Sequence, residues 1–144
     1  MAFTPISSQG CLLKLATTDV NPRTFALVDG VTSLAGSGGE RETLNATAIS
    51  DNAPRSVVGF PSPEIFEGDV NFDPTDVVHV ALKTAKAAGT RKLFKLTYSD
   101  GPGTSVWRYG YVAAFGMPDI QGNALVKTKL RIALDGAELA AEPA

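Results

Sequence analysis

Apolar and polar residues alternate along several short segments of this chain, and a period of two predicts β-strands. The first segment, from Gly10 to Thr17, is followed by a turn-rich stretch at residues 18–22. A second strand is expected from about Thr24 to Leu34. Within it the pair Asp29-Gly30 indicates a bulge rather than a turn, because apolar residues resume directly after it.

Two later strands carry apolar residues on one face and polar residues on the other. From about Glu64 to Phe72, the apolar face holds Phe66, Val70 and Phe72 and the polar face Glu67, Asp69 and Asn71. In the last strand, Val126, Thr128, Leu130, Ile132 and Leu134 alternate with Leu125, Lys127, Lys129, Arg131 and Ala133. An acidic stripe (Glu67, Asp69, Asp73) and a basic stripe (Lys127, Lys129, Arg131) result. The favoured interpretation is that each stripe is solvated or paired across strands, and the alternative is complementary charge between subunits.

A β-hairpin is predicted between these two strands. In its first arm Phe94, Leu96 and Tyr98 alternate with polar residues, and residues 99–103 form the turn. The second arm places a large apolar set on one face, which we expect to be the core face: Trp107, Tyr109, Tyr111, Ala113 and Phe115. The small-residue tail after Gly136, at about residues 137–144, is expected to be frayed and flexible.

One amphipathic helix is predicted at about residues 74–88. Asp73 can accept hydrogen bonds from the free amides at the helix start, and Pro74 suits the first helical position. Apolar Val77, Ala81 and Ala85 recur at helical spacing beside Val78 and Leu82, and Gly89 is a natural C-terminal stop.

From Gly36 to about Pro63 the periodicity is lost, and the composition predicts a long loop. Loops of this length are uncommon in compact domains and usually serve a function. The glycines at its start allow either a flexible loop or a segment that lies flat against another subunit. The whole pattern predicts a mostly β fold, a β-sandwich or short barrel of about six strands with one flanking helix. The chain is expected to form a single domain over residues 1–144, since no repeat or second domain is evident.

Composition narrows the functional classes. Of 144 residues, 44% are hydrophobic, yet no run of about 18 apolar residues predicts a membrane span. The start lacks a secretory signal, so the protein is expected to remain in the cytoplasm where it is made. The formal net charge of -2 gives no general attraction to nucleic acid. One cysteine and one histidine cannot form an internal disulfide or a four-ligand zinc site of Cys and His.

Residues suited to catalysis are scarce, and no enzyme, cofactor or metal is predicted. His79 lies within the predicted helix, where a structural or solvent-facing role is favoured over proton transfer. Cys11 lies in a predicted strand among leucines, where an inert buried thiol is ordinary. The glycine-rich run at residues 36–43 lacks the Lys-Ser/Thr ending of a phosphate loop and carries acidic Glu40 and Glu42 instead.

The order of these features resembles the tail tube proteins of long non-contractile tailed phages, a group that includes lambda-like phages and related gene transfer agents. The resemblance spans nearly the whole chain. It rests on the strand end at residues 31–36, on Gly38-Gly39 with Arg41, Leu44 and Thr47, on residues 58–61, on the strand to residue 74, on the helix and on the closing hairpin.

The resemblance implies a β-sandwich subunit of which six copies close into a ring, with rings stacking into a hollow tube that conducts DNA from the virion to the host. It further implies tail terminator, tape measure and distal tail proteins as partners. The loop at residues 36–63 would carry the contact between rings, aided by the two terminal segments. The candidate inter-ring residues are Gly36, Gly38, Gly39, Glu40, Arg41, Leu44, Thr47, Arg55, Gly59 and Phe60.

Two further expectations concern charge. A lumen that conducts DNA should not hold it, so Lys127, Lys129 and Arg131 are predicted to be paired or to point away from the channel. Together with Glu67 and Asp69 they are the candidates for charge contacts between subunits. Two alternative functions remain at this stage: a tube protein of the type VI secretion kind, and a solitary β-sandwich binding module of the virion.

Overall fold

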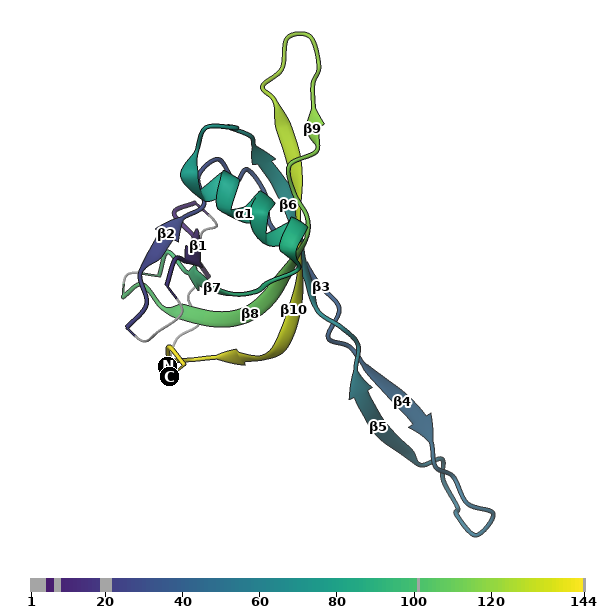
Figure 1. Ribbon diagram of the computed structural model, residues 1–144. Coiled ribbons are helices and arrows are strands. Elements are labelled where there is room, and N and C mark those ends of the chain that lie inside the picture. The colour runs from purple at the N-terminus through teal and green to yellow at the C-terminus, as the bar shows by residue number, and fades with distance from the viewer. Residues whose placement is uncertain (1–4, 7–8, 19–21, 101, 144) are drawn as a thin grey trace.

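The computed structural model describes residues 5–6, 9–18, 22–100 and 102–143 (Figure 1). The predicted turns at residues 18–22 and 99–103 lie partly outside these ranges. The elements in chain order are β1 (Leu12–Ala16), β2 (Phe25–Leu27), β3 (Ala35–Ser37), β4 (Arg41–Asn45), β5 (Ser56–Pro61), β6 (Ile65–Asn71), α1 (Val77–Ala88), β7 (Arg91–Thr97), β8 (Ser105–Ala114), β9 (Pro118–Asp119) and β10 (Lys127–Leu139).

In the described part of the chain, eight of these strands form one antiparallel sheet in the order β2-β1-β7-β8-β10-β6-β3, with β9 added beside β10. The sheet curves strongly, and α1 lies in its hollow (Figure 1). A single curved sheet with one helix encloses a core of side chains from most of the strands. The mostly β class with one flanking helix is therefore confirmed.

The core forms where the inward faces of the sheet meet α1. Its buried members are Leu13, Leu15, Val28, Val70, Leu82, Ala85, Phe94, Val112, Phe115, Leu130 and Ile132. The predicted alternation is confirmed in β6 and β10, where Val70, Leu130 and Ile132 are fully buried and the charged residues between them are exposed. Period-two patterning thus fixes which face of these strands is inside.

The predicted core face of β8 is wrong for most of its length. Buried positions in this strand are Arg108, Gly110 and Val112, whereas Tyr111 is 41% exposed on the opposite face. Phe115 is buried as predicted. The register against β10 shifts by one residue between the pairs Arg131–Ala114 and Ile132–Val112, which is typical of a β-bulge. This extra residue reverses the alternation, so Phe115 reaches the core although Trp107, Tyr109, Tyr111 and Ala113 face outward.

The helix begins three residues later than predicted, and a different aspartate caps it. The Asp76 carboxylate accepts hydrogen bonds from the amides of Val78 and His79. Asp73 instead accepts two hydrogen bonds from Thr75, through the amide and the hydroxyl, and these lower the pKa of its carboxyl. The predicted C-terminal stop is confirmed, because Gly89 is left-handed at φ 67° and its amide bonds the Ala85 carbonyl.

The predicted second strand is interrupted at Asp29-Gly30, which form a turn rather than a bulge. Gly30 has φ +83°, and a Cβ atom there would lie 2.6 Å from the Asn71 carbonyl oxygen. After the turn, Val31 forms an isolated bridge with Val70 of β6. The chain therefore passes from β2, at one edge of the sheet, to a position beside β6 within a few residues.

His79 holds this crossing to the start of α1. The buried imidazole accepts the Asp73 amide at Nδ1 (3.1 Å) and donates from Nε2 to the Asp29 carbonyl oxygen (2.7 Å). An acceptor Nδ1 and a donor Nε2 define one neutral tautomer. The favoured structural interpretation of His79 is confirmed, and its ring also packs against Phe72 and Phe115.

Two segments predicted to be irregular have regular structure. The segment at residues 36–63 contains part of β3 and the whole hairpin of β4 and β5, so its description as a long loop is wrong. The tail is not frayed at residues 137–139, because β10 continues to Leu139, which pairs with Trp107. Beyond β10, Glu142 accepts a hydrogen bond from the Arg23 amide at 2.7 Å and forms an ion pair with its side chain.

Candidate assembly surfaces

The β4–β5 hairpin projects from the body of the protein as a separate two-stranded ribbon (Figure 1). In register, Leu44 lies opposite Val57 and Thr43 opposite Val58. Val58 is 62% exposed and Phe60 93% exposed. A lone two-stranded hairpin is marginally stable in water, and exposed apolar side chains on a projection mark an interaction site. The hairpin is therefore the first candidate for contact with another molecule.

All but one of the predicted inter-ring residues lie in this projection or its base. Gly36 belongs to β3 in the main sheet, whereas Gly38, Gly39 and Glu40 join β3 to β4. Arg41 and Leu44 lie in β4, and Gly59 and Phe60 lie in β5. Sequence reasoning missed exposed Ile49, Val57 and Val58, although the run Val57-Val58-Gly59-Phe60 carries the β-branched and aromatic residues typical of a strand.

The remaining two predicted residues, Thr47 and Arg55, face each other across the hairpin tip. The Thr47 hydroxyl accepts the Arg55 amide at 2.9 Å. The Asp51 carboxylate accepts the Ala48 amide at 2.7 Å and lies 3.5 Å from the Arg55 guanidinium. These side-chain bonds to the backbone give the tip a defined conformation.

The hairpin base is attached to the sheet by a partly buried ion pair that the sequence did not reveal. The Arg108 guanidinium donates to Glu64 Oε2 at 2.9 Å and to the Gly136 carbonyl at 2.9 Å. The hydrogen bond from Arg108 lowers the pKa of the Glu64 carboxyl. At the same base, a Cβ atom on Gly38 would lie 1.9 Å from the Pro63 carbonyl oxygen. Only glycine fits this crossing.

The acidic and basic stripes lie side by side on the outer face of the sheet. Arg131 is registered opposite Glu67 and Lys129 opposite Asp69, while Lys127 faces Asn71. This arrangement agrees with the favoured interpretation of cross-strand neighbours. No ion pair within 4.0 Å joins the two stripes in the described part of the chain. Their charged ends are therefore available to solvent or to another subunit.

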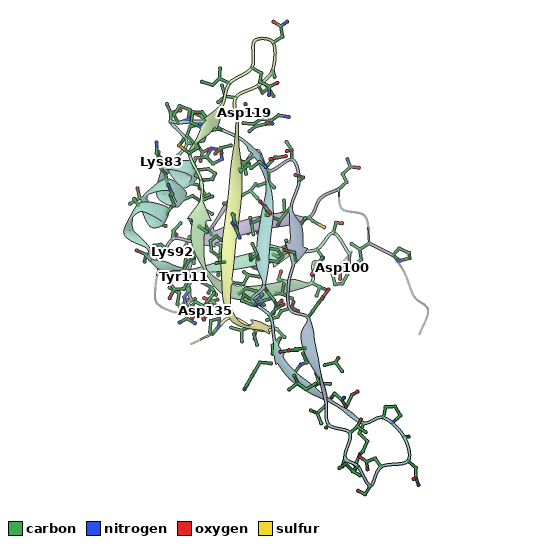
Figure 2. All side chains as sticks on the ribbon, turned by 90° about the vertical axis from the view of Figure 1, so that its right-hand side faces the viewer. Lys83, Lys92, Asp100, Tyr111, Asp119 and Asp135 are labelled. Atoms are coloured by element: carbon green, nitrogen blue, oxygen red, sulfur yellow. The ribbon has the colours of Figure 1, made fainter. Side chains whose placement is uncertain are left out.

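A groove of about 680 Å³ lies beside β9. Its walls include Phe115, Met117, Asp119, Leu125, Lys127 and Lys129. Met117 is 79% and Leu125 68% exposed, and neighbouring Ile120 is 74% exposed. Figure 2 shows Asp119 at the end of the molecule opposite the projecting hairpin. The protein thus has apolar surface at both ends of its long axis.

No catalytic or metal site stands out among the described residues. They contain no group of three His, Cys, Asp or Glu side chains placed to hold a metal ion. Both ring nitrogens of His79 are engaged by backbone groups, and Cys11 is half-buried with its Sγ 3.7 Å from the Ser99 hydroxyl. The described helix is also too short and too polar to cross a membrane.

Chains of several solved phage-like assemblies share this fold. The SPP1 tail tube matches with a TM-score of 0.71 and 16% identity, covering 94% of this chain and 78% of that chain. The virion of a native gene transfer agent particle contains a chain that matches with a TM-score of 0.70 and 16% identity, covering 94% of this chain and 98% of its own. A chain of the anti-feeding prophage baseplate matches with a TM-score of 0.63 and 7% identity, covering 96% and 98%.

Sequence comparison gives the family. No curated protein sequence matches the chain. The family model of the phage tail tube protein matches residues 14–140, which include the sheet, the helix and the projecting hairpin. Residues 14–140 make up well over half of the chain, which therefore belongs to the phage tail tube protein family.

Proposed function

We propose that this protein is a structural subunit, without catalytic activity, that closes into six-membered rings stacking into the hollow tail tube of a phage or gene transfer agent. Family membership supports the tube. A gene transfer agent tail with C6 symmetry contains a chain of the same fold, with a TM-score of 0.70 and 17% identity, which supports the number six. The assembled protein would be a component of the virion tail, built in the host cytoplasm.

The projecting hairpin is the observation that carries this proposal. It buries little of its own apolar surface, and its strand residues remain largely exposed. The ion pair of Arg108 with Glu64 holds its base against the sheet, and the hairpin extends away from the body of the protein (Figure 1). Such a ribbon is suited to bridging one ring to the next, in keeping with the role expected for residues 36–63.

Ring closure has its own structural basis. The main sheet ends in the short edge strands β2 and β3, which have no further strand beside them in the described part of the chain. Open edges favour pairing with another chain, and a closed barrel of several chains removes them. Edge-to-edge contact of neighbouring subunits would join their sheets around a central channel.

A channel that conducts DNA should not bind it, so we expect the basic residues of the outer sheet face to be neutralised by neighbours or directed away from the channel. Acidic Glu67 and Asp69 lie opposite basic Arg131 and Lys129, so no large surface of one sign forms there. Phosphate binding draws its strength from clustered cations, which neighbouring carboxylates weaken.

Tail terminator, tape measure and distal tail proteins remain the proposed partners at the tube ends and within the tube.

Electron microscopy of the purified protein in negative stain tests the proposal. Hollow tubes or stacked rings with six-fold end views are the expected result. A protein that stays monomeric at all concentrations would overturn the tube and favour a solitary binding module of the virion. Discrete rings would support ring closure and are compatible with either tube family, the tail tube proposed here or a tube of the type VI kind.

A further inference from the structure

The groove beside β9 is built like a receptor for an apolar ribbon. Its volume of about 680 Å³ lies within the range of sites that enclose a ligand of several side chains. Met117 and Leu125 are exposed on its walls, and Phe115 closes its inner side as part of the core. An apolar groove with exposed walls lowers its free energy by taking up apolar side chains.

The projecting hairpin carries matching side chains at the other end of the molecule. Phe60, Val58 and Ile49 are 93%, 62% and 108% exposed. The hairpin continues from the β3–β6 end of the sheet, whereas β9 extends the opposite end beside β10 (Figures 1 and 2). A second copy displaced along the strand direction would therefore bring its hairpin toward the groove.

The two surfaces carry net charges of opposite sign. Residues 40–61 hold three carboxylates (Glu40, Glu42, Asp51) and two arginines (Arg41, Arg55), whereas the groove is lined by three lysines (Lys86, Lys127, Lys129) and two carboxylates (Asp69, Asp119). Glu40 and Glu42 precede and begin the hairpin, and no ion pair engages either carboxylate in the described part of the chain. Around the groove, Lys86, Lys127 and Lys129 are likewise exposed and free of ion pairs. Opposite charges at the rims of two apolar surfaces favour one orientation of contact over others.

We propose that the groove beside β9 receives the β4–β5 hairpin of a second copy of this chain, which rests on the proposed tube function. The contact uses two different surfaces, so each subunit keeps one free hairpin and one free groove. Head-to-tail contacts of this kind propagate without limit when they do not close on themselves. Stacking of rings in one direction follows from this pairing.

Two variants test the two surfaces of the proposed contact one at a time. Phe60→Asp places a charge on the hairpin, and Leu125→Asp places one in the groove. Both side chains are exposed in the subunit, so each variant should fold, which circular dichroism and thermal unfolding verify. Burying an unpaired carboxylate is costly, so each change should raise the critical concentration for tube growth by about tenfold or more. Val77→Asp is the matched control, because Val77 on α1 is 82% exposed, between Leu125 at 68% and Phe60 at 93%, and this variant should assemble normally.

Mixing the two defective proteins gives the decisive result. Rings of Phe60→Asp keep an intact groove and rings of Leu125→Asp keep an intact hairpin, so the mixture should form paired rings that do not grow further. Normal tubes from Leu125→Asp, equal loss in Val77→Asp, or no pairing in the mixture would each overturn the assignment of the groove. These outcomes leave the tube function standing, whereas failure of the unaltered protein to form tubes would overturn that function itself.

Discussion

Arg108 and Glu64 are joined by a hydrogen-bonded ion pair of 2.9 Å that connects the inside of the curved sheet to the base of the projecting hairpin. The Arg108 side chain is 8% exposed and that of Glu64 42% exposed. A buried guanidinium needs a partner, because an unpaired buried cation loses its hydration without compensation. The pair therefore stabilises the junction between the sheet and the base of the hairpin.

Glu64→Gln removes the charge of the pair but keeps an amide oxygen that can accept from Arg108. The free energy of unfolding should therefore fall by about 1–1.5 kcal/mol, the difference between a charged and a neutral hydrogen bond. Denaturant unfolding of the subunit at neutral pH measures this. The matched control is Asp135→Asn, which breaks an exposed pair of the same 2.9 Å length with Arg91 and should cost less than about 1 kcal/mol. Equal effects of the two variants would contradict a structural role for Arg108.

The same pair predicts an acid-sensitive part of the stability. Because Arg108 lowers the pKa of Glu64 below its ordinary 4.5, the folded state binds a proton less readily than the unfolded state. Its contribution is complete above pH 4.5 and is lost as the pH falls through the lower, folded pKa. The stability difference between the unaltered protein and Glu64→Gln should therefore shrink on acidification. A difference that grows below pH 4.5 would show that the pair is not formed.

His79→Leu should destabilise the protein by about 1–3 kcal/mol, because it leaves the Asp73 amide and the Asp29 carbonyl without their partner. Amide hydrogen exchange should report faster exchange at Asp73. Thr84→Leu, on the exposed side of the same helix, is the control and should change stability by about 0.5 kcal/mol or less. Unchanged exchange at Asp73 would rule out the bond to His79.

Gly68→Ala should cost about 3 kcal/mol, because a Cβ atom there would lie 1.9 Å from the Ser33 carbonyl oxygen and one of the two chains must move. Gly122→Ala meets nothing within 4 Å and serves as the control. Thermal unfolding of both variants compares them. If Gly68→Ala unfolds at the same temperature as the unaltered protein, the close approach of residue 33 to β6 is incorrect.

The features that could be predicted from the sequence are those that depend only on residues close to one another in the chain. The alternation in β6 and β10, the helix and its stop at Gly89 follow from period and turn chemistry alone. The helix cap was misassigned because Asp73 and Asp76 are both capable caps. In the structure the Asp73 amide donates to His79, and Asp76 is the residue that caps the helix.

Other features depend on partners far away in the sequence. The bulge that moves Phe115 into the core appears only in the register of β8 against β10. Arg108 lies on the buried face of β8, and the residues near it in the sequence do not indicate that it forms an ion pair with Glu64. The hairpin at residues 36–63 was hidden because a strand pair with both faces exposed lacks the one-sided apolar pattern by which strands are recognised.

Replacing the hairpin by a two-residue turn tests most directly whether subunits assemble into tubes through the hairpin. At its base the Ser62 amide bonds the Glu40 carbonyl at 2.7 Å, so Asn-Gly can replace residues 41–61 and join Glu40 to Ser62. Electron microscopy of this variant beside the unaltered protein is the measurement, with circular dichroism to verify folding. We predict hollow tubes from the unaltered protein and folded subunits or single rings from the variant. Tubes of normal length from the variant would contradict assembly through the hairpin.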